Sequence, residues 1–85
     1  MPLFYFHIFD GRDVLDSDGL ELADESAARI EAVRLAGLAL HDDAPRVVER
    51  GRWTLDVTDG QGSLLYHVAV QATDRRIPTS RPVPL

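Results

Sequence analysis

The densest group of residues that could do chemistry is an acidic run near the N-terminus, made up of Asp10, Asp13, Asp16, Asp18, Glu21 and Glu25. Several carboxylate oxygens in one loop are what Ca²⁺ requires. If Gly19 is the sixth residue of a calcium loop, Asp16 and Glu25 fall on ligand positions, but the first ligand position is Val14. The segment before it also has the pattern of a strand, whereas a calcium loop follows a helix. We therefore interpret the run as turns and helix caps in water, and predict no metal there.

Two histidines are the next candidates for metal ligation. His7 and His67 are predicted to lie on one face of a sheet, opposite a helix, with Asp10 and Asp56 in reach. Three such ligands could hold a transition metal. Single histidines on separate strands have no diagnostic ligand spacing, however, so we predict cross-strand packing and neither metal nor cofactor. His41 lies near the predicted helix end, where the dipole favours a positive charge.

The hydroxyl groups are not arranged for nucleophilic catalysis, which needs a nucleophile beside a base. The candidates in turns, a cap or the C-terminal tail are Ser17, Ser26, Ser63 and Ser80. No nucleophile elbow, P-loop or dinucleotide-binding pattern occurs, because the glycines of 60–62 are too close together and lie in a hairpin turn. The sequence therefore predicts a protein that is not an enzyme.

The charge opposes general binding to nucleic acid. The formal net charge is −5, which weakens attraction to phosphate backbones. The charge is uneven, with ten acids and three arginines in 1–45 against four acids and six arginines in 46–85. The arginines of the second half are Arg46, Arg50, Arg52, Arg75, Arg76 and Arg81. Together with Trp53 and Tyr66 they leave one alternative open, an acidic accessory or regulatory module that contacts nucleic acid, although both aromatic residues are predicted to lie in the core.

The length and the absence of cysteine limit the chain further. Its 85 residues suffice for one domain. Disulfides, zinc–thiolate sites and thiol catalysis are excluded, since there is no Cys. No apolar run approaches the ~20 residues of a membrane span, and no signal peptide is apparent, so we expect a cytoplasmic protein without a membrane partner.

The first elements that must position these residues are two strands and a helix. The aromatic run 3–9 ends at the Asp-Gly pair 10–11, a strong hairpin signal, and a two-residue turn would place His7 opposite Val14 in a second strand over about 12–16. Asp24 is a suitable N-cap for a helix that extends to about Leu40 or His41. In this helix one apolar stripe is formed by Ile30, Val33, Gly37 and Leu40, while alanines permit close approach to a sheet. Residues 46–52 are predicted to be a polar connector.

A second hairpin follows. Residues 53–58 alternate between apolar and polar, and 59–62 form a turn. The expected core pairs are Val57 with Leu64, Leu55 with Tyr66, and Trp53 with Val68. The domain is expected to cover 1–72, followed by a flexible Arg- and Pro-rich tail over 73–85.

Several of these residues together resemble the sequence pattern of a known protein family. They are the opening 1–7, Asp10-Gly11, Asp16, Gly19, the Ala-Ala-Arg of 27–29, Trp53, Val57-Thr58-Asp59 and Gly62. Over roughly 1–66 the chain resembles a family of uncharacterised small bacterial proteins, a domain of unknown function, that open with a Met-Pro-x-aromatic strand and an Asp-Gly turn. The resemblance implies this fold and carries no activity, because the shared residues are strand aromatics, turn residues and helix alanines.

The predicted fold class is α+β, with the order β-β-α-β-β, a four-stranded mostly antiparallel sheet and one helix on one of its faces. The strand order across the two hairpins does not follow from the pattern. One helix cannot cover both faces, so we expect an apolar interface on the second face, formed by Tyr5, His7, Phe9, Val14, Leu65, His67 and Ala69. The predicted function is that of a non-enzymatic small domain that forms a homodimer or docks a protein partner.

Overall fold

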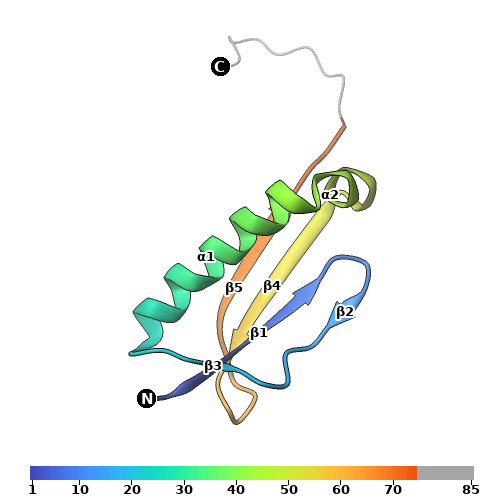
Figure 1. The fold of residues 1–85 in the computed structure, drawn as a ribbon. Coiled ribbons are helices and arrows are strands. Elements are labelled where there is room, and N and C mark those ends of the chain that lie inside the picture. Colours follow the sequence, from blue (N-terminus) through green and yellow to red (C-terminus); the bar gives the residue numbers. More distant parts are fainter. Residues whose placement is uncertain (75–85) are drawn as a thin grey trace, which may run out of the picture.

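The structure is a computed structural model, and it describes residues 1–74 (Figure 1). The elements in chain order are β1 (Leu3–Phe9), β2 (Asp13–Val14), β3 (Leu20–Glu21), α1 (Glu25–Asp42), α2 (Ala44–Arg50), β4 (Arg52–Thr58) and β5 (Leu64–Gln71). The antiparallel sheet has the order β2-β1-β4-β5, and β3 also pairs with β1. The α+β class and the β-β-α-β-β arrangement are confirmed, with β3 and α2 as additions. The part of the predicted tail from residue 75 onward lies outside the described residues.

The first hairpin has a longer turn than the sequence predicts. Phe9 pairs with Asp13 and Ile8 with Val14, so the loop contains the three residues 10–12. Gly11 adopts a φ of 98°, which lies in the left-handed region that favours glycine. The prediction that Val14 faces His7 is therefore wrong. One extra loop residue shifts the register by one and moves Val14 to the face that Ile8 occupies.

Helix α1 begins as predicted, with the Asp24 Oδ1 atom accepting a hydrogen bond from the Ala27 amide at 2.9 Å. Its buried residues are Ala28, Ala32 and Ala36, one stripe at four-residue spacing. The larger apolar stripe of Ile30, Val33, Gly37 and Leu40 is exposed to solvent. Small side chains let the helix approach the sheet closely, and the bulkier residues are then left on its flank.

Helix α2 replaces the predicted polar connector. Pro45 stands in its first turn, where a missing amide hydrogen costs nothing, and Gly51 ends it with a φ of 76°. Val47 is buried against the core, so this short helix covers the end of the sheet near Trp53.

In the second hairpin the pairs are Val57 with Tyr66, Leu55 with Val68, and Trp53 with Val70. The register thus differs by two residues from the predicted one, because the loop covers 59–63 and Leu65 is an extra residue at a bulge. The Asp59 Oδ1 atom accepts hydrogen bonds from the amides of residues 61 and 63, which stabilises this longer loop. A shift of two keeps each side chain on its face, so Tyr66 and Val68 stay on the core side. The predicted core position of Leu64 is wrong, since this residue is 59% exposed.

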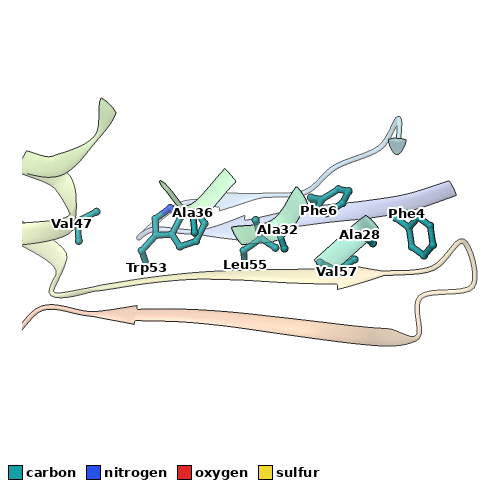
Figure 2. Close-up of a cluster of buried hydrophobic side chains, with 9 residues drawn as sticks. All are labelled: Phe4, Phe6, Ala28, Ala32, Ala36, Val47, Trp53, Leu55 and Val57. Carbon is teal, nitrogen blue, oxygen red and sulfur yellow. The ribbon is translucent and has the colours of Figure 1, made fainter. Parts of the chain in front are cut away.

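The core lies between α1 and one face of the sheet (Figure 2). Trp53, Leu55 and Val57 of β4 are at most 1% exposed. The whole buried cluster consists of Phe4, Phe6, Ala28, Ala32, Ala36, Val47, Trp53, Leu55 and Val57. In residues 1–74, no helix has the length and apolar character that crossing a membrane would require.

Candidate functional site

The face of the sheet opposite α1, called the open face below, carries most of the predicted interface. Strand alternation places Tyr5, His7, Phe9, His67 and Ala69 on it. Val14 does not belong to it, because it shares the face of Ile8, and Leu65 packs at the bulge against the buried cluster. The open face also carries Thr54, Asp56 and Thr58, so it is more polar than the sequence predicts.

A row of three polar residues crosses this face. His7, Asp56 and His67 lie directly opposite one another on β1, β4 and β5. The Nδ1 atom of His67 lies 2.5 Å from Asp56 Oδ1. His7 Nδ1 accepts a hydrogen bond from the Asp16 amide at 3.1 Å, and its Nε2 atom donates to Thr58 Oγ1 at 3.0 Å. Both ring nitrogens of His7 are thus engaged, and among residues 1–74 no three potential ligands come together as a metal centre would need.

Asp16 holds the loop that separates β2 from β3. Its Oδ2 atom accepts a hydrogen bond from the Phe6 amide of β1 at 3.2 Å, and its Oδ1 atom accepts from the amides of Asp18 and Gly19. Burial raises the pKa of Asp16, but the hydrogen bonds from Gly19, Phe6 and Asp18 and the interaction with His7 outweigh it, so the pKa is lowered. At this edge of β1 the carboxylate accepts the hydrogen bond of the Phe6 amide, which a neighbouring strand would otherwise accept. Both of its oxygens are engaged by backbone amides of the described residues.

Asp10 is the other acidic residue with a defined role. It is 5% exposed and lies 3.6 Å from the Arg12 guanidinium and 3.8 Å from that of Arg46. Burial raises its pKa, yet the amide and guanidinium of Arg12 together with Arg46 lower it below the ordinary value. Because Asp10 lies beside Arg46, it partly neutralises the positive charge of that arginine, which weakens the attraction of Arg46 to a phosphate backbone. Of the second-half arginines, Arg75, Arg76 and Arg81 lie outside the described residues.

These two carboxylates predict a loss of stability in acid. Each binds a proton less readily in the folded chain than in the unfolded one, where the pKa of Asp is about 3.9. Stability is then fully present above that value and falls as the pH drops through the lowered pKa values. We expect a flat urea midpoint from about pH 7 to about pH 5 and a decline below about pH 4. An Asp16→Asn variant should decline less steeply, and a wild-type midpoint that stays constant through the acid range would contradict the assignment.

The candidate nucleophiles are exposed in the part of the chain that the structure describes, at Ser17, Ser26 and Ser63. Ser80 lies outside the described residues. Ser17 and Ser63 lie in loops, as predicted, and Ser26 lies in the first turn of α1.

Sequence reasoning missed a groove between α1 and β5, called the α1–β5 groove below. It has a volume of about 340 Å³ and is lined by Arg29, Ile30, Val33, Arg34 and Tyr66. The Arg29 guanidinium lies over the Tyr66 ring, 5.8 Å from its centre. Ile30 and Val33 are 55% and 57% exposed beside it. The four-residue spacing of the alanines could have indicated this groove. If the alanines form the buried stripe of α1, the large apolar residues of the helix must lie on its exposed flank.

Strand β5 borders this groove and forms one edge of the sheet. It is eight residues long, and within residues 1–74 it pairs with β4 alone. Its sequence contains neither proline, lysine nor another permanently charged residue. Natural proteins commonly protect long edge strands with such residues, so this edge is unusually open to pairing.

Comparison with known proteins places the chain in a wider set. The model of a family described as Domain of unknown function (DUF6894) matches residues 3–71. Neither a curated protein nor a solved structure matches the chain.

Proposed function

The chain belongs to this family of unknown function, and from the geometry of α1 and β5 we propose that it is a non-enzymatic small domain that self-associates as a homodimer. The observation that carries the proposal is the exposed apolar stripe of α1 beside the α1–β5 groove. Ile30, Val33 and Leu40 are 55%, 57% and 39% exposed on this side of the helix. Soluble monomers seldom leave contiguous apolar surface of this kind uncovered.

The shape of this surface favours a protein over a small ligand. From Ile30 to Leu40 the stripe extends about 15 Å along the helix, whereas a small molecule is usually enclosed in a deeper pocket. A second copy of the chain presents the same stripe, and two-fold homodimers use one patch on both subunits. Ile30, Val33 and Leu40 can meet their own copies, with Arg29 and Arg34 beside them in the groove.

The polar residues support a role without catalysis. His7 has both ring nitrogens in hydrogen bonds within the domain, and Asp10 and Asp16 are bound by backbone amides or arginine. The groove itself is lined by apolar atoms and two arginines, with neither a nucleophile nor a carboxylate. Association rather than chemistry is therefore the function that these residues serve best.

Light scattering or sedimentation at tens of micromolar tests the proposal. We expect a dimer for the wild type, and dissociation for Val33→Asp because a charge in an apolar interface is costly to desolvate. Leu38→Asp is a matched control, since Leu38 is 58% exposed on the same helix but lies about 140° around its axis from Val33. Phe9→Asp tests the open face as the interface. A strictly monomeric wild type would refute self-association.

A further inference from the structure

We propose that two copies pair through β5, antiparallel across a two-fold axis at Val68, so that two sheets become one continuous sheet. This inference rests on the proposed self-association and specifies its partner and register. It follows from the direction of the backbone groups of β5, from the side chains that the pairing brings together, and from the position of α1 above them.

Within residues 1–74, the backbone of β5 leaves a regular set of groups without a partner at the edge of the sheet. The Ala72 amide donates to the Gly51 carbonyl at 2.9 Å, so its N–H points toward β4. In an antiparallel pair successive residues alternate between pointing toward the partner strand and away from it. Tyr66, Val68 and Val70 therefore bond to β4, while the N–H and C=O groups of His67 and Ala69 point to the free edge. A second strand could accept and donate bonds there.

The register follows from how many residues of β5 find a partner residue in the second copy. With the axis at Val68, His67 of each copy lies opposite Ala69 of the other, and Leu65 lies opposite Gln71. The outward-pointing backbone groups of His67 and Ala69 are then paired in both copies. An axis at His67 or Ala69 would leave residues at one end of each strand without a partner. The strand also has no bulge between 66 and 71 that would interrupt the ladder.

The side chains fit this register on both faces. On the helix side, Val68 meets Val68 of the second copy and Tyr66 meets Val70, an aromatic and β-branched pair that stabilises antiparallel sheets. On the open face, the large His67 ring lies beside the small Ala69 side chain. Between the two strands no like charges face each other, because β5 has no permanently charged residue.

Helix α1 adds to the same interface. Arg29 lies over Tyr66, and two strand residues, about 6.6 Å, correspond to about four helical residues. Val33 therefore lies near the level of Val68 and close to the axis. A Cβ atom added at Gly37 would have no neighbour within 4 Å, so the side of α1 at Gly37 is uncovered. The exposed stripes of both helices would cover each other.

The absence of cysteine makes the register directly testable, because every introduced thiol is the only one in its chain. Across the proposed axis the two Val68 Cα atoms would be about 4.5 Å apart, which a disulfide can bridge. We expect Val68→Cys to form a covalent dimer under mild oxidation on a non-reducing gel. Val70→Cys is the matched control on the same strand and face, where the two thiols would be about 13 Å apart and should not crosslink.

Other results of the crosslinking experiment would show which part of the proposal is wrong. A dimeric wild type in which Phe9→Cys crosslinks and Val68→Cys does not would overturn this inference and move the interface to the open face, while self-association stands. Crosslinking of His67→Cys or Ala69→Cys in place of Val68→Cys would overturn the register. A monomeric wild type would overturn the proposed function itself.

A second variant keeps the test independent of thiol chemistry. In Ala69→Pro the lost amide hydrogen points to the free edge, so the isolated domain should keep its fold, as judged by circular dichroism. We expect loss of the dimer, because the proline ring blocks the edge, and a retained dimer in Ala69→Ser. A folded Ala69→Pro variant that remains dimeric would exclude pairing through this edge.

Discussion

Replacement of Trp53 by alanine is expected to lower the free energy of unfolding by about 3–5 kcal/mol. Trp53 is 1% exposed and lies between α1, α2 and the sheet, so its removal leaves a cavity that neighbouring elements cannot close without moving (Figure 2). A domain of this size has a total stability of about 5–10 kcal/mol, so this loss is a large share of the total and the melting temperature should fall clearly.

Urea or thermal unfolding followed by circular dichroism measures the effect. Val48→Ala is the control, because Val48 is on α2 and 76% exposed, so its truncation should change stability by less than about 0.5 kcal/mol. Equal unfolding midpoints for Trp53→Ala and the wild type would show that Trp53 does not anchor the core.

Replacement of Asp16 by alanine is expected to cost about 2–3 kcal/mol. Its carboxylate accepts hydrogen bonds from the amides of Phe6, Asp18 and Gly19, and alanine leaves all three without that acceptor. The Phe6 amide is at the edge of β1 between β2 and β3, where no other strand reaches it. The loop that carries Gly19 against the Tyr5 ring should loosen as a result.

Asp18→Ala is the matched control two residues away, since the hydrogen bond that links Asp18 to Asp16 uses the Asp18 amide, which alanine retains. Asp16→Asn keeps one acceptor oxygen and should fall between the two. Hydrogen exchange at the Phe6 amide gives the local readout, with faster exchange expected in Asp16→Ala. If Asp16→Ala and Asp18→Ala were equally stable, the carboxylate would not hold the loop.

The local elements could be predicted because their signals act over few residues. Asp24 caps α1 as its type and position indicate, and the alternation of β4 puts Trp53, Leu55 and Val57 on the buried face. The core side was also right for Tyr66 and Val68 of β5, although their register was not, and it was wrong for Leu64. A shift of two residues preserves the face of every side chain, so the pattern of alternation cannot distinguish the two registers.

Turn lengths were harder to predict for a related reason. Asp10 and Gly11 suit a two-residue turn as well as the three-residue loop that the structure contains. In the longer loop Asp10 accepts a hydrogen bond from the Arg12 amide and lies 3.8 Å from Arg46, which is 36 residues later in the chain, and no local pattern contains the contact with Arg46. Helix α2 was missed because residues 46–52 were interpreted as a polar connector, although Pro45 suits the first turn of a helix.

The sequence by itself determined the α+β class, the order of the main elements, the capped start of α1 and the face that each residue of β4 presents. Each of these depends on capping, turn chemistry or period-two alternation, which neighbouring residues decide. Only the tertiary structure decided the strand order β2-β1-β4-β5, the register of both hairpins and the stripe of α1 that is buried. These depend on how closely distant elements can pack. Alanines let α1 come nearest to the sheet, and that contact leaves Ile30 and Val33 exposed beside the free edge of β5.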